Sequence, residues 1–335
     1  MARPGPTNSL SDVAGLSIGT AEDAAALTGV TVIVPDARAV CAADVRGGGP
    51  GTRETDALAP GGIAGAVDAV VLAGGSVYGL AAADGVTAAM GVEGKGFGLI
   101  EMPGVPRSPV IPAAILFDLA NGGNKAWGDA PPYAALGKRA YAARSRDVKL
   151  GNFGAGLGAK AGALKGGQGT ASIVTNDGFT IAALACVNSF GSVTMPGQRA
   201  FWAAPFELGG EFGGVASQPR PFDLEDWGNS KLQAQARANT TVACVAVDAD
   251  LTPVEAKRIA QMASAGLARA VRPVFAPFDG DVVFALATGA KAAPEPRPLA
   301  VARFGALAAD CLARAIARGV HAAESVGVHT AWRDL

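Results

Sequence analysis

The sequence predicts a mixed α/β protein of a single domain over residues 1–335, with mainly mixed or antiparallel sheets. A chain of 335 residues that is 50% hydrophobic and only 17% charged can bury a sizeable core. Short β-prone runs separated by glycine-rich turns fill the first part of the chain, and strand and helix patterns alternate near its C-terminal end. These observations favour strands and helices that share one core.

The first part of the chain contains several apolar runs of strand length, each bounded by turn-forming residues. The predicted strands there are Gly15–Gly19, Val30–Val34, Val40–Val45, Ala69–Leu72 and Val110–Phe117. Two further segments have helical patterns, around Val77–Met90 and Pro132–Ala143. The N-terminal part is therefore expected to be rich in strands, with two helices among and after them.

The glycine-rich segment Gly154–Gly169 is predicted to be a loop of tight turns. Its spacing departs from the nucleotide motif Gly-x-Gly-x-x-Gly, and Gly166-Gly-Gln-Gly lacks a following Lys-Ser or Lys-Thr. Close backbone packing, or a backbone-lined wall of an active site, explains the glycines without a phosphate ligand. Downstream, Asn176-Asp-Gly between the runs Thr170–Thr175 and Phe179–Val187 predicts an antiparallel hairpin.

The C-terminal part begins with the least apolar stretch, Pro196–Leu232, which we expect to be a long surface excursion. Thr252-Pro-Val-Glu255 is a capping box with proline at the first helical position, so a helix should run from there through about Val271. The remaining predicted elements are the strands Thr240–Val247 and Asp281–Thr288 and the long helix Pro298–Ala323.

Charge and hydropathy exclude several classes of partner. A net charge of −1 and a pI near 6.2 give no electrostatic case for nucleic acid or an anionic membrane. Apolar runs such as Ala69–Ala73 and Ile181–Val187 are far shorter than the ~20 residues that a membrane span needs. The N-terminal Met1-Ala-Arg-Pro-Gly-Pro has no apolar signal-peptide core. We therefore expect a soluble, cytoplasmic protein that binds neither membranes nor nucleic acids.

Cysteine and histidine usage narrows the chemistry. Both histidines, His321 and His329, lie near the C-terminus without metal-ligand spacing around them, so we expect no metal and no cofactor. A Ser-His-Asp or Cys-His mechanism has little to draw on, and a catalytic base must come from elsewhere. The cysteines are widely spaced in apolar surroundings, which predicts buried free thiols: Cys41, Cys186, Cys244 and Cys311.

The segment Asn239-Thr240-Thr241 has three interpretations. It matches the Asn-x-Thr glycosylation acceptor, which a chain without a signal peptide does not expose to that machinery. It is also an ordinary polar start to a strand. In the third interpretation, the Thr240 hydroxyl attacks the carbonyl of Asn239 and the chain cleaves itself, which leaves Thr240 with a free α-amine of pKa ~8 that can act as a base. Spacing alone does not decide among them.

A series of ordered motifs makes the chain similar to a known family. The motifs are Asp44-Val-Arg-Gly-Gly-Gly-Pro-Gly-Thr-Arg-Glu-Thr-Asp56, Leu72-Ala-Gly-Gly-Ser-Val-Tyr-Gly79, Ile111-Pro-Ala-Ala-Ile-Leu-Phe-Asp118, Gly154-Ala-Gly, Lys165-Gly-Gly-Gln-Gly-Thr-Ala-Ser172 and Asn239-Thr-Thr. With them, the chain resembles the L-aminopeptidase/D-esterase family, which includes β-peptidyl aminopeptidases and 6-aminohexanoate-oligomer hydrolases. The resemblance runs along nearly the whole length.

The resemblance implies an αββα sandwich like that of ornithine acetyltransferase, with the helices outside. It also implies a precursor that is cut once, between Asn239 and Thr240, into a large subunit of residues 1–239 and a small subunit of residues 240–335. Such cleaved units would form a homo-oligomer and hydrolyse short peptides or peptide-like amides. Two alternatives keep the same fold: an acyltransferase resembling ornithine acetyltransferase, and an uncleaved, inactive scaffold.

The resemblance also implies roles for individual residues. Thr240 falls at the nucleophile position, and Asn188 matches an asparagine that supplies an oxyanion-hole donor. Asp279 and Asp281 match a pair of residues beside the nucleophile, and carboxylates there can accept hydrogen bonds from its hydroxyl and amine.

Two positions depart from the family pattern. Phe117 stands where the family has a tyrosine in the site, so that hydroxyl is missing. Ala163 replaces a lysine at the end of the glycine-rich run, and Lys160 is the first candidate to supply an ammonium group instead; Lys165 is the weaker one.

Overall fold

Two five-stranded sheets form the centre of the computed structural model, which describes every residue except 1, 101, 219–220, 222, 224 and 232–238. The N-terminal sheet has the strand order β1-β2-β5-β6-β4, and the C-terminal sheet has the order β3-β12-β11-β10-β9. Both sheets are mixed, because β5 and β6 run parallel in the first and β11 and β12 run parallel in the second. The predicted mixed α/β class is confirmed.

The bounds of the strands are as follows. The N-terminal sheet consists of β1 (Leu16–Asp23), β2 (Thr28–Pro35), β4 (Thr52–Arg53), β5 (Val70–Ala73) and β6 (Ala113–Ile115). The C-terminal sheet consists of β3 (Val40–Val45), β9 (Gly167–Val174), β10 (Thr180–Asn188), β11 (Thr240–Ala249) and β12 (Val282–Lys291). A small hairpin, β7 (Lys160–Ala161) and β8 (Leu164–Lys165), precedes β9.

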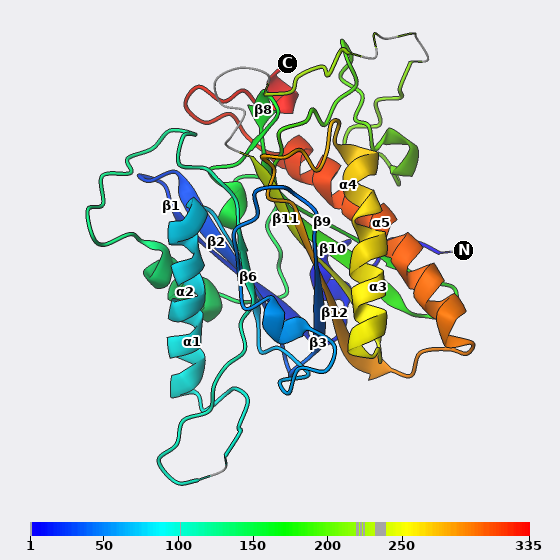
Figure 1. The fold of residues 1–335 in the computed structure, drawn as a ribbon. Helices are drawn as coiled ribbons and strands as arrows, with labels where there is room; N and C mark the ends of the chain where they lie inside the picture. Colours follow the sequence, from blue (N-terminus) through cyan, green and yellow to red (C-terminus); the bar gives the residue numbers. More distant parts are fainter. Residues whose placement is uncertain (1, 101, 219–220, 222, 224, 232–238) are drawn as a thin grey trace.

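Helices cover the outer face of each sheet (Figure 1). Helices α1 (Ala82–Val92) and α2 (Tyr133–Ala142) pack on the N-terminal sheet. Helices α3 (Pro253–Ala263), α4 (Ala265–Ala270) and α5 (Arg297–Ala322) pack on the C-terminal sheet. A third apolar core lies between the two sheets and draws residues such as Leu72 from β5 and Leu184 from β10. The layers are therefore helix, sheet, sheet, helix.

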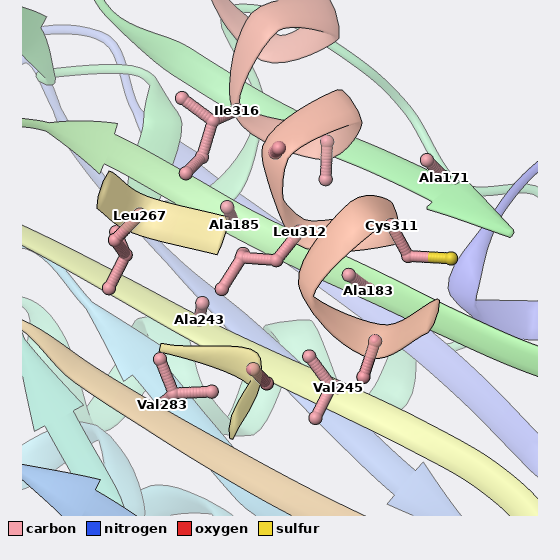
Figure 2. Close-up of a cluster of buried hydrophobic side chains, with 14 of the residues drawn as sticks. Ala171, Ala183, Ala185, Ala243, Val245, Leu267, Val283, Cys311, Leu312 and Ile316 are labelled. Atoms are coloured by element: carbon pink, nitrogen blue, oxygen red, sulfur yellow. The ribbon is translucent and has the colours of Figure 1, made fainter. Parts of the chain in front are cut away.

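Small residues let α5 approach the C-terminal sheet closely. Figure 2 shows Leu312 and Ile316 of α5 lying over strand positions that are mostly alanine, among them Ala183 and Ala185. A Cβ atom on Gly169 of β9 would lie 2.0 Å from the backbone oxygen of Ala315, so only glycine fits there. The high alanine and glycine content thus serves close packing between helix and sheet.

Most predicted elements are present, with differences at their ends. The capping box holds, because the Thr252 side chain accepts a hydrogen bond from the Glu255 N–H. The helix predicted through Val271 divides at Ser264 into α3 and α4, and the Ser264 hydroxyl bonds both Ala260 O and a carboxylate oxygen of Asp44. The first turns of the helix predicted over 77–90 are a 3₁₀-helix, and the strand predicted over 110–117 shortens to β6, which follows Pro112.

The region 196–232 was expected to be a surface excursion, and its described part is more firmly packed than that. Phe201 and Phe212 are buried, in edge-to-face contact with each other, and Phe201 stacks on Trp332 near the C-terminus. Leu232 and some other positions of this region lie outside the described residues. The four cysteines are buried and unpaired, as predicted. Within the part of the chain that the structure describes, no helix has both the length and the apolarity to cross a membrane.

Candidate active site

Thr240 and Asn188 lie opposite each other at one end of the C-terminal sheet. Thr240 is the first residue of β11, Asn188 is the last residue of β10, and the two are partners in the antiparallel register. Side chains alternate between the faces of a strand. Cys186 of β10 and Val242 of β11 belong to the core between the sheets, so Asn188 and Thr240, two positions away, face the same inter-sheet side. Both are buried.

The Thr240 hydroxyl lies against the peptide bond that precedes it. Its Oγ1 donates a hydrogen bond to the backbone oxygen of Asn239, which is also buried. Gly280 also lies against the hydroxyl, since a Cβ atom there would lie 2.6 Å from Thr240 Oγ1 and 2.9 Å from the backbone oxygen of Gly49. The hydroxyl is therefore confined next to one carbonyl group of its own chain.

The Asn188 side chain is oriented by several hydrogen bonds. Its Oδ1 accepts from Lys160 N at 2.9 Å, from Asn121 Nδ2 at 3.1 Å and from Lys231 Nζ at 3.5 Å. Its Nδ2 donates to the backbone oxygen of Phe117 at 2.9 Å. Because three donors converge on Oδ1 and Nδ2 faces a carbonyl oxygen, the amide oxygen and the amide nitrogen have fixed directions.

Asp279 and Asp281 lie just before the start of β12, and their carboxylates accept hydrogen bonds from backbone N–H groups. Asp281 Oδ1 accepts from Thr241 N at 2.7 Å, and Oδ2 accepts from Phe275 N at 3.3 Å. Asp279 accepts from Phe190 N at 3.4 Å and from Ala276 N at 3.1 Å. Asp281 thus holds the residue after Thr240 in place, and Asp279 holds the segment that follows Asn188.

Burial disfavours the charged form of both carboxylates. It raises the pKa of Asp279, while the hydrogen bonds from Ala276 and Phe190 and the nearby Lys231 act in the opposite direction. Burial, together with the neighbouring Asp279 charge, raises the pKa of Asp281 to about 7. A pair of this kind can hold or release a proton near neutral pH.

The glycine-rich loop after β3 donates backbone hydrogen bonds to the main chain of the two aspartates. Arg46 N and Gly47 N donate to the backbone oxygen of Asp281, and Gly49 N donates to the backbone oxygen of Asp279 at 2.8 Å. A Cβ atom on Gly47 would lie 2.2 Å from that same Asp279 oxygen. The motif over 44–56 therefore positions the Asp279-Gly-Asp281 segment against Thr240.

The structure brings the other two predicted site positions to Asn188 through their backbones. Phe117 contributes its carbonyl oxygen, and Lys160 contributes its N–H. Burial lowers the pKa of the half-buried Lys160 ammonium group. Lys165, the weaker candidate, is fully buried and donates to the backbone oxygens of Gly156 and Gly166 at 2.9 and 2.7 Å. It therefore links two parts of the glycine-rich segment.

Three residues near Asn188 were missed by the sequence reasoning. Lys231 is buried, and its Nζ also lies 3.3 Å from the backbone oxygen of Asn188. Asn121 is buried and bonds both Asn188 and Gly158 O, and His329 Nε2 contacts Asn121 O at 2.7 Å. Asn121 lies in Asn-Gly-Gly-Asn, which reads only as a turn, and a single lysine or histidine in a polar segment carries no periodic signal.

The donor set of the site does not indicate a metal. Within the described residues, no group of three or more His, Cys, Asp or Glu side chains comes together as a metal site would require. What the arrangement offers is a confined hydroxyl, an oriented amide and two carboxylates, which is a set suited to nucleophilic attack on a carbonyl group.

Comparisons with known proteins agree with this chemistry. The chain is 43% identical over 346 aligned residues to an uncharacterized aminopeptidase of Mycobacterium tuberculosis, and the match covers 98% of each chain. It is 28% identical over 288 residues to a 6-aminohexanoate-oligomer endohydrolase of Kocuria sp., covering 83% of this chain and 74% of that protein.

Solved structures have the same fold. A β-aminopeptidase of Burkholderia sp. superposes with a TM-score of 0.71 at 25% identity, covering 98% of this chain and 90% of the other. An L-aminopeptidase D-Ala-esterase/amidase of Ochrobactrum anthropi, described as a variant of the Ntn hydrolase fold, has a TM-score of 0.67 at 22% identity, covering 98% and 89%. The sequence profile of peptidase family S58 matches residues 8–331. The chain belongs to peptidase family S58 and is an aminopeptidase-type hydrolase.

Proposed function

We propose that this hydrolase activates itself by cleaving the Asn239–Thr240 bond and then uses Thr240 as an N-terminal nucleophile on short peptides or peptide-like amides. The observation that carries the proposal is the contact of the buried Thr240 hydroxyl with the backbone oxygen of Asn239. That contact holds the attacking atom beside the carbonyl group of the bond to be cut.

In the first step, Thr240 Oγ attacks the carbonyl carbon of Asn239. An Oγ–C bond forms, the C–N bond to Thr240 breaks, and the nitrogen takes up the hydroxyl proton. Water then hydrolyses the resulting ester, which leaves a carboxyl group on Asn239 and returns the hydroxyl to Thr240. The new α-amine of Thr240 has an ordinary pKa of ~8 and can serve as the base in later turnovers.

In turnover, Thr240 Oγ attacks the substrate carbonyl while its α-amine takes the proton. The amide N–H of Asn188 is the proposed donor to the developing oxyanion, and such a donor is worth ~3 kcal/mol. This role requires the Nδ2 hydrogen that is not directed at Phe117 O. Asp281 keeps the Thr240–Thr241 backbone in place through the hydrogen bond from Thr241 N.

The two alternatives from the sequence are not favoured equally by the findings. The relatives are named as aminopeptidases and endohydrolases, which does not favour an acyltransferase. The likeness to ornithine acetyltransferase stays an expectation from the sequence. The uncleaved, inactive scaffold is tested directly by the state of the chain.

The test is the fragment pattern of the purified protein together with its activity. Denaturing electrophoresis should show two bands, residues 1–239 and 240–335, and the smaller should begin Thr-Thr-Val-Ala-Cys. Thr240→Ala removes the attacking hydroxyl, so the chain should stay in one piece and hydrolysis of amino-acyl p-nitroanilides should fall at least ~10³-fold.

Thr240→Ser is the matched control, because it keeps a hydroxyl at the same position and should still cut. A wild-type chain that hydrolyses these substrates while remaining uncut would overturn the proposed mechanism. Undiminished hydrolysis by a Thr240→Ala chain supplied already cut at residue 240 would show that another group is the nucleophile.

A further inference from the structure

Lys231 is a buried lysine at the nucleophile site that has no role in the proposed mechanism. It belongs to the segment just before the proposed cleavage point, and the residues that follow it, 232–238, lie outside the described part of the chain. Its side chain is almost fully buried. Burying an ammonium group is costly unless polar groups surround it, so its contacts indicate what it does there.

The first set of contacts is with Asn188. Lys231 Nζ lies 3.3 Å from the backbone oxygen of Asn188 and 3.5 Å from its side-chain Oδ1. One ammonium group therefore spans the main chain and the side chain of the same residue. It restrains the rotation of the Asn188 amide, whose nitrogen faces Phe117 O on the other side.

The second relation is with Asp279, through Phe190. Lys231 N donates to Phe190 O at 3.0 Å, and Phe190 N donates to Asp279 Oδ1 at 3.4 Å. The Phe190 backbone thus lies between the lysine and the carboxylate. The ammonium form of Lys231 also attracts the Asp279 carboxylate and so favours the ionised form of Asp279, while full burial lowers the pKa of Lys231 well below its usual range.

The segment that carries Lys231 is anchored to the site. The Trp227 ring makes an edge contact with Phe190 at a centroid distance of 6.2 Å, and Ala163 N donates to Asn229 O at 2.6 Å. Ser230 Oγ reaches Arg272 O at 3.3 Å. Residues 227–231 are therefore docked against the site.

We propose that Lys231 is a positioning residue for the hydrolase reaction, which fixes the Asn188 amide through its Nζ and places a positive charge beside Asp279. The proposal rests on the proposed function for its kinetic part. It also implies that the end of the large fragment, through Lys231, stays in place after the cut and completes the site.

The titratable groups facing Lys231 set the sign of the expected effect. They are Asp279 before β12, Lys160 of β7, which repels the lysine, and His329 near the C-terminus, whose pKa is lowered mainly by burial. Removing the Lys231 charge should raise the pKa of Asp279, so that this carboxyl group takes up its proton at a higher pH.

The experiment compares Lys231→Gln, Lys231→Met and Lys231→Arg. Glutamine keeps a donor for Asn188 and loses the charge, so the acidic limb of the kcat/KM profile should move up by about one pH unit, with the rate at high pH kept near wild type. Methionine loses both, so the limb should move equally and kcat should fall at every pH. Arginine keeps the charge and should leave the acidic limb in place.

Lys149→Met is the control, because Lys149 is an exposed lysine paired with Asp147. This variant should match wild type.

A second readout does not depend on activity. Carbon-13 carboxyl NMR of aspartate-labelled protein follows the Asp279 carboxyl group directly, in the uncut Thr240→Ala background. The Asp279 signal is assigned as the one that disappears in Asp279→Asn. In Lys231→Gln this signal should titrate at a higher pH than with Lys231 present. An unmoved titration in Lys231→Gln, with kcat of all three variants lowered uniformly across pH, would overturn the proposal and leave Lys231 a structural residue. If no variant, wild type included, hydrolyses amides, the proposed function fails, while the NMR titration still decides on Lys231.

Discussion

Each sheet carries a buried aspartate near its end, and the two differ in what they hold. Asp118, just after β6 of the N-terminal sheet, accepts hydrogen bonds from Thr28 Oγ1 at 2.6 Å and from Gly75 N at 2.8 Å. Asp281, just before β12 of the C-terminal sheet, binds Thr241 N next to the candidate nucleophile. Burial raises the pKa of both carboxyl groups.

Burial and a raised pKa are common to both carboxyl groups, so the difference between them lies in their partners. Asp118 joins a strand and a glycine turn of the N-terminal sheet, so its partners are parts of the scaffold. Asp281 and Asp279 have their partners around Thr240 and Asn188, at the end of the C-terminal sheet. We therefore expect changes at that end to alter turnover, and changes within the N-terminal sheet to alter stability alone.

Among the substitutions that test this comparison, the largest expected effect is that of Gly280→Ala. The new Cβ atom would lie 2.6 Å from Thr240 Oγ1 and must displace the hydroxyl. A displacement of about 1 Å in a reacting group costs about 100-fold in rate, so we expect a loss of that order in kcat and incomplete cutting of the chain. Initial rates on an amino-acyl p-nitroanilide and denaturing electrophoresis measure the two effects.

Gly91→Ala is the matched control for that substitution. Gly91 lies in α1, on the far side of the N-terminal sheet, and a Cβ atom there would meet nothing within 4 Å. Replacing glycine by alanine lowers the conformational entropy of the unfolded chain, and the helix accommodates the new methyl group. This variant should therefore be more stable by about 0.5–1 kcal/mol and fully active. Equal rates for Gly280→Ala and Gly91→Ala would contradict the placement of Gly280 against the nucleophile.

The next prediction concerns Asp281→Asn and the pH dependence of stability. Because the pKa of Asp281 is raised to about 7 in the folded protein, the folded state keeps a proton that the unfolded chain releases near its ordinary pKa of ~3.9. The stability from the protonated form is fully present below about pH 4 and is lost as the pH rises to about 7. Asparagine has no proton to lose, so the variant should gain stability relative to the parent over that range, by on the order of 1–3 kcal/mol.

Urea unfolding at several pH values measures this difference, with both chains in the uncut Thr240→Ala background so that one polypeptide unfolds. The effect on turnover in the active background should be smaller than that of Gly280→Ala, since an amide oxygen can still accept from Thr241 N. A stability difference that does not change between about pH 4 and about pH 7 would mean that Asp281 titrates as an exposed carboxyl group does.

Much of this architecture follows from local patterns. The strands near 30–34 and 40–45, the hairpin around Asn176-Asp-Gly and the capping box at Thr252 depend on neighbouring residues, and all form as predicted. Element ends moved where a distant contact decides, as at Ser264, whose hydroxyl bonds Asp44 across the molecule.

The site divides in the same way. Thr240, Asn188 and the two aspartates were named from motif resemblance, and the structure brings them together where β10 ends and β11 and β12 begin. Lys231 and Asn121 were not foreseen, because they reach Asn188 only through the tertiary fold from segments that look like ordinary loops. Phe117 was named for its missing hydroxyl, whereas its backbone oxygen makes the contact.

The smallest expected effect on turnover is that of Leu72→Ala, which tests the scaffold side of the comparison. Leu72 lies in β5 and is fully buried in the core between the sheets. Its apolar side chain offers no hydrogen bond to the candidate site residues. Removing its side chain leaves a cavity and should lower the free energy of unfolding by about 2–5 kcal/mol. Because the end of the C-terminal sheet is unaltered, kcat measured well below the unfolding temperature should stay within about twofold of wild type. Thermal unfolding followed by circular dichroism, together with rates at a low temperature, measures both quantities.

An unfolding free energy equal to that of wild type would show that the core closes around the lost side chain. A kcat reduced as strongly as that of Gly280→Ala would show that the two sheets do not act as separate scaffold and site, and the comparison would then fail.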